Sequence, residues 1–112
     1  MELTGDILRG HTDAIILSIL SEQDNYGYQI NLEISRKSEV DFMLTEATLY
    51  TTFKRLESEE LILSYWKDGL YVKRKYYSIT EKGKAYLVEM SQQWEKTKHV
   101  IDKFIGEKKN EG

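Results

Sequence analysis

The chain has 112 residues, 40% of them hydrophobic and 31% charged, with a formal net charge of −3, which fits one globular domain and excludes a disordered or fibrous protein. It has no cysteine, which excludes a disulfide framework, a thiolate zinc site and a cysteine nucleophile, and which fits a cytoplasmic location. No stretch approaches the roughly 20 apolar residues that a membrane span needs, so we expect no membrane segment.

Two helices are expected in the first part of the chain. Residues 7–21 are mostly apolar, which predicts a helix that is buried on more than one side. A polar turn is expected at residues 22–25. Residues 26–38 (YGYQINLEISRKS) then show an amphipathic pattern, which predicts a second helix.

A third helix is expected to begin at Thr45, an N-cap residue type that is followed by Glu46 in the first turn. Leu49, Phe53 and Leu56 lie four and three residues apart, which makes them the inward stripe of this helix. The face left free carries Ala47, Thr51 and Lys54, flanked by Thr48, Tyr50 and Arg55.

A β-hairpin is expected next, because residues 61–66 (LILSYW) and 71–79 (YVKRKYYSI) have the composition of strands. Asp68-Gly69 lies between them and favours a two-residue turn in which both central residues have positive φ.

The last predicted helix begins after Thr80 and runs to about residue 105. Its apolar positions alternate at spacings of three and four and are interrupted once by Thr97: Leu87, Met90, Trp94, Ile101 and Phe104. This is a short heptad seam, and little of its own domain is left to cover it.

Three helices followed by a hairpin and a long helix predict a mainly α protein, a winged helix-turn-helix with a C-terminal helix. In this fold the third helix enters the major groove of DNA and the hairpin lies along the backbone. The expected boundaries are residues 1–79 for the winged helix-turn-helix and residues 80–112 for the last helix and tail.

Positive charge is concentrated in the middle of the chain. The net charge is −5 over residues 1–44, +2 over residues 45–84 and 0 over residues 85–112. Most basic side chains of the middle segment lie in two groups: Lys54 and Arg55, and Lys73, Arg74 and Lys75. Local positive potential governs binding to nucleic acid more than the total charge does.

Several runs of residues, in order along nearly the whole chain, carry a resemblance to a known family. They are Leu8-Arg9-Gly10, residues 24–28 (DNYGY), residues 46–57 (EATLYTTFKRLE), residues 64–66 (SYW), Arg74-Lys75-Tyr76-Tyr77 with Thr80, and Gly83. The chain resembles the PadR family of transcriptional regulators, of the short type with a single C-terminal helix.

The resemblance implies a homodimer joined through the last helix, which packs with the first helix of the partner. The implied interface residues are Leu87, Met90, Trp94, Ile101 and Phe104. It also implies repression at a pseudo-palindromic DNA operator. The chain is further similar to a multidrug-resistance regulator of this family, which implies a planar aromatic ligand stacked on Trp94 and control of an efflux or stress gene.

Three departures from the family pattern stand out. Glu60 occupies the turn after the third helix, where the family usually has glycine. The Gly-Arg-x-Arg lead-in to the wing is replaced by residues 70–75 (LYVKRK). Lys98 stands where the drug-binding relative has an acidic residue, which argues against a cationic ligand.

The predicted DNA contacts combine hydroxyl groups, a threonine-rich helix face and basic side chains. They are Thr45, Ala47, Thr48, Tyr50, Thr51, Lys54 and Arg55 on the third helix, and Lys73, Arg74 and Lys75 on the wing. Hydroxyls and cations bind phosphate, and threonine methyl groups contact thymine. Because no Arg–guanine or Asn–adenine reader is obvious, much of the specificity is expected to come from DNA shape.

Other interpretations stay open. The third helix and hairpin could bind a partner protein instead of DNA, and Trp94 and Tyr50 could be packing residues only. An enzyme is disfavoured, because the sequence has no credible acid/base pair and none of the common catalytic motifs. His11 and His99 have no partner at metal-binding spacing, so no metal or cofactor is expected.

Overall fold

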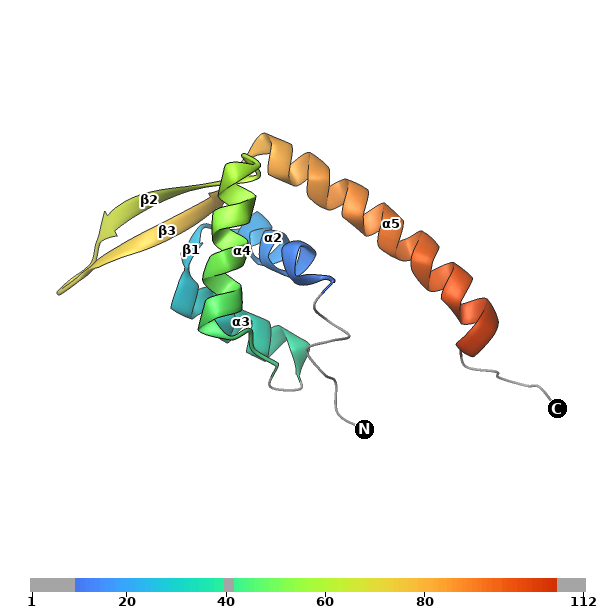
Figure 1. Ribbon diagram of the computed structural model, residues 1–112. Helices are drawn as coiled ribbons and strands as arrows, with labels where there is room; N and C mark the ends of the chain where they lie inside the picture. The colour runs from blue at the N-terminus through green and yellow to red at the C-terminus, as the bar shows by residue number, and fades with distance from the viewer. Residues whose placement is uncertain (1–9, 40–41, 107–112) are drawn as a thin grey trace.

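The computed structural model describes residues 10–39 and 42–106. Its elements in chain order are α2 (Thr12–Glu22), β1 (Asn25–Tyr26), α3 (Gly27–Ser38), α4 (Glu46–Ser58), β2 (Ile62–Asp68), β3 (Lys73–Ile79) and α5 (Glu81–Ile105). The β2–β3 hairpin projects to one side of the helices and α5 leaves on the other (Figure 1). The predicted winged helix-turn-helix with a long C-terminal helix is confirmed.

The hydrophobic core lies between α2, α3, α4 and the base of the sheet. The predicted inward stripe of α4 is confirmed, because Leu49, Phe53 and Leu56 are at most 2% exposed. The Phe53 ring stacks on Tyr77 of β3 with ring centroids 3.9 Å apart. This contact joins α4 directly to the sheet, so the third helix and the wing are positioned as one unit.

The first predicted helix begins later than expected. Gly10 and His11 form a turn, and α2 begins at Thr12. Glycine is a poor helix former, which accounts for the late start. Residues 7–9 of the prediction lie outside the described residues.

The sheet has three strands, in the order β1-β3-β2, where the sequence predicted a two-stranded hairpin. The additional strand is β1, which pairs antiparallel with β3 through Asn25 and Tyr26. The predicted polar turn at residues 22–25 is therefore wrong at both ends, because Glu22 belongs to α2 and the buried Asn25 belongs to a strand. The helix predicted to begin at Tyr26 begins one residue later, because Tyr26 also belongs to β1.

The structure contains the predicted hairpin, but not the predicted two-residue turn at its end. β2 and β3 pair from Ile62–Ile79 to Asp68–Lys73. That register leaves residues 69–72 as a four-residue loop, closed by a 2.8 Å hydrogen bond from the Gly69 N–H to the Val72 carbonyl. Gly69 does not have positive φ. The pairing of the strands thus overrides the local preference of Asp-Gly for a tighter turn.

The end of α4 explains the unusual Glu60. This residue has φ of 63°, in the left-handed region that favours glycine. Its N–H bonds the Glu57 carbonyl and the Leu61 N–H bonds the Leu56 carbonyl, both at 2.9 Å. This is the hydrogen-bond pattern of a Schellman cap. Glycine suits the position because the backbone must turn left-handed there, and Glu60 adopts the same conformation at a cost in free energy.

Helix α5 starts close to the core and then leaves it. The Thr80 side chain accepts a 2.9 Å hydrogen bond from the Gly83 N–H, as expected for an N-cap. A Cβ on Gly83 would lie 2.1 Å from the Leu61 carbonyl oxygen, so this approach requires glycine. Farther along, Ile101 and Phe104 are 46% and 72% exposed. Among the described residues, no helix is both long and apolar enough to cross a membrane.

Candidate nucleic-acid interface

The outer face of α4 is exposed along its length. Thr45 caps the helix by accepting a 3.1 Å hydrogen bond from the Thr48 N–H. The predicted contact residues of this face are all exposed: Thr45, Ala47, Thr48, Tyr50, Thr51, Lys54 and Arg55. Thr52, by contrast, is buried, and its hydroxyl donates to the Thr48 carbonyl at 2.7 Å. The threonines therefore have different roles: Thr45 caps α4, Thr48 and Thr51 lie on its exposed face, and Thr52 packs in the core.

Tyr50 has two environments. Its ring packs edge-on against Phe53, with centroids 5.4 Å apart. Its hydroxyl lies so close to Gly27 that a Cβ there would be 2.5 Å from the oxygen. The residue is nevertheless 44% exposed. It is therefore both a packing residue between α3 and α4 and a surface hydroxyl.

The guanidinium of Arg55 is engaged within the protein. Its Nη1 and Nη2 donate to the two carboxylate oxygens of Asp13 on α2, at 2.7 and 2.5 Å. This hydrogen bonding raises the pKa of Arg55 above its ordinary value. Arg55 thus fastens α4 to α2, and a DNA contact by this side chain stays a prediction.

The wing cations rest on a layer of tyrosine rings. Arg74 lies 4.5 Å from the centroid of Tyr26, and Lys75 lies 5.8 Å from that of Tyr77. Lys67, which the sequence analysis did not single out, lies 4.9 Å from Tyr76. Cations above aromatic faces are held in place without losing their charge.

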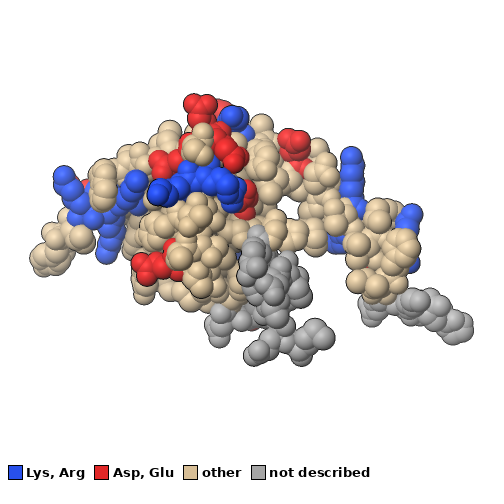
Figure 2. All heavy atoms as spheres, in the orientation of Figure 1, with Lys and Arg blue, Asp and Glu red and all other residues tan. Residues whose placement is uncertain are grey.

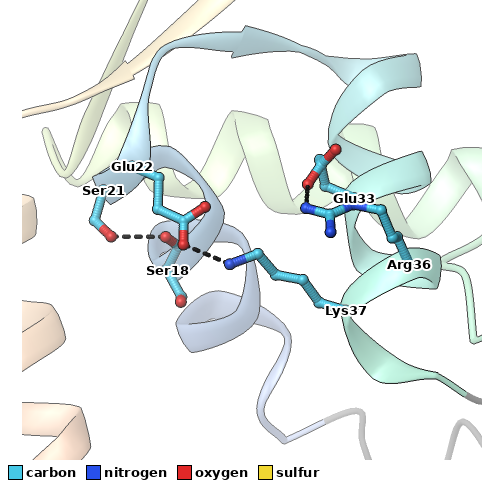
Figure 3. Close-up of polar contacts among 6 residues, drawn as sticks. All are labelled: Ser18, Ser21, Glu22, Glu33, Arg36 and Lys37. Carbon is cyan, nitrogen blue, oxygen red and sulfur yellow. Dashed lines mark hydrogen bonds and ion pairs between the residues drawn. The ribbon is translucent and has the colours of Figure 1, made fainter.

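Between residues 10–39 and 42–106, no carboxylate pairs with any of the wing cations: Lys67, Lys73, Arg74 and Lys75. The basic residues of α3 differ. Arg36 pairs with Glu33 at 2.5 Å and lowers the pKa of that carboxyl, and Lys37 pairs with Glu22 of α2 (Figure 3). The wing cations therefore form one group of positive charge without carboxylate partners, at the left of Figure 2, where other Lys and Arg side chains also lie over the middle of the molecule and toward its right-hand end.

A cleft of about 430 Å³ separates the start of α3 and α4 from the wing. Its walls are aromatic and basic: Tyr26, Gly27, Tyr28, Tyr50, Trp66, Lys73, Arg74 and Lys75. The structure thus brings Tyr50 together with the predicted wing residues Lys73, Arg74 and Lys75 at one cleft, whereas the other predicted residues of α4 do not line it: Thr45, Ala47, Thr48, Thr51, Lys54 and Arg55. Sequence reasoning missed Tyr28 and Trp66, which are 66% and 65% exposed. Only their membership of the DNYGY and SYW runs could have signalled them.

A second, apolar groove of about 740 Å³ lies between α2 and the first half of α5. Leu87, Met90 and Trp94 line it from α5. Trp94 is 47% exposed, and the His11 ring meets it edge-on with centroids 5.1 Å apart. Lys98 pairs with Glu95 at 2.9 Å. The predicted stacking residue thus lies in a groove wide enough for a small ligand.

Comparison with known proteins identifies the family. Residues 16–89 match the transcriptional regulator PadR-like family. A solved transcriptional regulator from Clostridium thermocellum is 43% identical with a TM-score of 0.83, covering 89% of this chain and 98% of that one. A PadR family transcription regulator from Clostridium difficile is 38% identical with a TM-score of 0.76, covering 86% and 99%. An uncharacterized protein from Lysinibacillus sphaericus is 50% identical over an alignment of 103 positions that covers 89% of this chain and 93% of that protein. The chain belongs to the PadR-like family of transcriptional regulators.

Proposed function

We propose that this protein is a homodimeric repressor that binds a pseudo-palindromic operator. The observation that carries the proposal is the cleft between α4 and the wing, which is lined by Tyr50 of α4 and by wing cations that have no carboxylate partner among the described residues. The same helix presents an exposed face rich in threonine. In such a dimer each α4 reads one major-groove half-site, and the two half-sites are separated by about 34 Å, one turn of DNA.

The proposed dimer uses α5. Ile101, Phe104 and the adjacent Ile105 are 46%, 72% and 80% exposed, on a helix that extends away from the domain. Apolar side chains on one such helix gain stability when a second copy covers them. Leu87, Met90 and Trp94 extend the same seam toward the core. Residues 1–79 then act as the DNA-binding part, with α2 adding to the dimer, and residues 80–112 as the dimerisation part.

The proposed ligand is a planar aromatic molecule that stacks on Trp94 in the groove between α2 and α5. A ligand that prefers one spacing of the two α4 helices shifts the dimer toward that spacing. Binding of ligand and binding of DNA are then coupled, and each changes the affinity for the other by the same factor. We propose that the ligand releases the operator of a multidrug-efflux or stress gene.

DNA binding is tested by retention of genomic fragments at increasing salt. A repressor retains particular fragments, and its log affinity falls linearly with log salt concentration. Lys73→Ala combined with Lys75→Ala is expected to lower that slope by about 0.9 for each phosphate that the variant no longer binds. Failure to retain any fragment at low salt would overturn the proposal and favour the alternative, a winged-helix module that binds a partner protein.

Ligand binding is tested by tryptophan fluorescence. The chain has two tryptophans, so the variant Trp66→Phe leaves Trp94 as the only one. Planar aromatics are expected to quench Trp66→Phe strongly and the matched control Trp94→Phe weakly. If no member of a broad panel of planar aromatics quenches the fluorescence of either variant, even at ligand concentrations well above micromolar, the ligand part of the proposal is wrong.

A further inference from the structure

The tip of the wing is apolar and exposed. Residues 69–72 connect β2 to β3, and within this loop Leu70 is 87% exposed, Tyr71 is 93% exposed and Val72 is 54% exposed. The uncharged atoms of the hairpin's end project at the left of the molecule, with basic residues directly behind them (Figure 2). Hairpin loops are normally built from Gly, Asn, Asp, Ser and Pro, so three bulky apolar residues in four are unusual.

The fold itself does not require these side chains. The loop is closed by the backbone bond from Gly69 to Val72. Leu70 and Tyr71 are almost fully exposed, so they add little to the core. Large apolar groups in water are an aggregation liability unless they bind something. Their place in the chain is therefore explained better by a binding partner than by stability.

The surroundings of the tip indicate which partner this is. Lys67, Lys73 and Arg74 lie within two residues of the loop, and none forms an ion pair with a carboxylate in the described part of the chain. Asp68 ends β2 opposite Lys73, so the immediate surroundings of the loop hold three cations and one carboxylate. Three such cations beside an apolar tip fit a partner that has dense negative charge and apolar surface between the charges. Duplex DNA has this composition, with phosphates along the rims of its grooves and sugars and base edges inside.

The reach of the wing is also suitable. β1 pairs with β3 only at Tyr76 and Tyr77, so the last three strand pairs of the hairpin, from Trp66–Lys75 to Asp68–Lys73, extend beyond the third strand. At about 3.3 Å per residue, this arm is roughly 10 Å long before the loop begins. The major groove is about 12 Å wide, so its rim lies about 6 Å from a helix at its centre. An arm of roughly 10 Å exceeds this half-width, so its tip can pass the bounding phosphates and reach the adjacent groove while α4 occupies the major groove.

We propose that Leu70 and Tyr71 enter the minor groove beside each half-site as an apolar wedge. The cations below them bind the phosphates on the groove's rims. Apolar side chains inserted there partly unstack a base step and bend the duplex. The wedge selects flanking sequences that are easily unstacked and whose minor groove is free of the guanine 2-amino group. This inference rests on the proposed function, because it requires that α4 bind DNA.

The test compares three variants on a duplex selected from random DNA by the wild-type chain. The wedge variant is Leu70→Ser combined with Tyr71→Ser. The phosphate variant is Lys73→Ala combined with Lys75→Ala. The control is Leu63→Ser, another exposed apolar residue of the same hairpin but at its base. Since Leu70 and Tyr71 bury almost nothing, the wedge variant is expected to keep the melting temperature of the wild type.

The wedge variant is expected to bind about tenfold more weakly with an unchanged salt slope, because it removes apolar contact and no charge. The phosphate variant is expected to lower the slope, and Leu63→Ser to change neither quantity. A second pair of duplexes carries inosine–cytosine or guanine–cytosine in the flank, which differ only by the minor-groove amino group. The wild type is expected to prefer the inosine duplex several-fold, and the wedge variant to bind both equally.

Each outcome bears on one proposal. Wild-type affinity of the wedge variant, or equal binding of the two duplexes by the wild type, would overturn the wedge and leave the repressor intact. A wedge variant whose salt slope falls with its affinity would also contradict it, since the tip would then be placing phosphate contacts. If the wild type selects no duplex at low salt, the repressor proposal fails and the wedge fails with it.

Discussion

Arg55 of α4 and Asp13 of α2 are joined by two hydrogen bonds, from Nη1 to Oδ2 at 2.7 Å and from Nη2 to Oδ1 at 2.5 Å. The residues before and after Asp13 are Thr12 and Ala14, and Ala14 lines the groove between α2 and α5. The pair therefore connects the helix beside the proposed ligand groove to the helix proposed to read DNA. It offers a route by which movement of α2 changes the position of α4.

This pair is expected to stabilise the fold and not to bind phosphate. Arg55 is about half exposed and Asp13 largely buried, so an interaction of about 1 kcal/mol is expected, above the usual surface pair because of its two-bond geometry. A double-mutant cycle of Asp13→Ala and Arg55→Ala in urea denaturation measures it. The matched control is the Arg36–Glu33 pair within α3, which is expected to show a clearly smaller coupling because water screens it.

The same variants decide the role of Arg55 at DNA. If Arg55 serves α2 alone, Arg55→Ala leaves the salt slope of DNA binding unchanged. If it is a phosphate contact, as the sequence predicted, Arg55→Ala lowers the slope by about 0.9. Asp13→Ala would then free the guanidinium and strengthen binding. The two roles of Arg55 therefore predict different salt slopes for Arg55→Ala.

Glu60→Gly is expected to stabilise the protein. The left-handed backbone at Glu60 costs a residue with a Cβ about 1–2 kcal/mol, and glycine removes this cost. Glycine also makes the unfolded chain more flexible, which lowers the free energy of unfolding by about 0.4–1 kcal/mol and offsets part of the gain. The net gain is about 0.5–1 kcal/mol, or a few degrees in melting temperature. The neighbouring control is Glu59→Gly, where φ is −90° and glycine should destabilise. A lower melting temperature for Glu60→Gly would show that its carboxylate contributes more than the backbone costs.

What the sequence predicted, and what it did not, follows from the range of the interactions. The cap and inward stripe of α4 depend on residues three and four apart, so Thr45, Leu49 and Phe53 were identified correctly. Strand β1 has two residues and pairs with positions about fifty residues away, so no local period announces it. The Arg55–Asp13 pair spans 42 residues and is equally invisible. The wing turn was mispredicted because strand register outweighed the local Asp-Gly signal.

Stability is expected to fall in alkali through two tyrosines. The hydrogen bond that Tyr65 donates to Asp24 at 2.6 Å raises the pKa of Tyr65 to about 12. Burial raises the pKa of Tyr77 to about 12 as well. The folded state therefore holds these protons more tightly than the unfolded state, whose tyrosines have the ordinary pKa of 10.0. Their contribution is complete below pH 10 and disappears as the pH rises through 12.

Urea denaturation at several pH values between 9 and about 12 measures this decline. Tyr65→Phe is expected to be less stable than the wild type at pH 9 and to lose less stability on going to higher pH. Tyr71→Phe is the control, because Tyr71 is 93% exposed, and its profile should follow that of the wild type. A wild-type free energy of unfolding that stays constant up to pH 12 would contradict the assignment.

Lys98 is expected to weaken the binding of cationic aromatics at Trp94. Residues four apart lie on the same face of a helix, so the Lys98 side chain lies one turn from Trp94, where its ammonium pairs with Glu95. Lys98→Ala removes a repelling charge and frees the Glu95 carboxylate to face a cation. In the Trp66→Phe background, this change should tighten binding of a cationic planar aromatic about threefold at low salt, as expected for an exposed charge. A neutral aromatic of the same shape should bind with unchanged affinity.

The control variant Lys96→Ala also removes one positive charge, but Lys96 does not pair with Glu95, so this variant should have a smaller effect on the binding of the cationic ligand. Equal gains for cationic and neutral ligands would mean that Lys98 acts through its size and not through its charge.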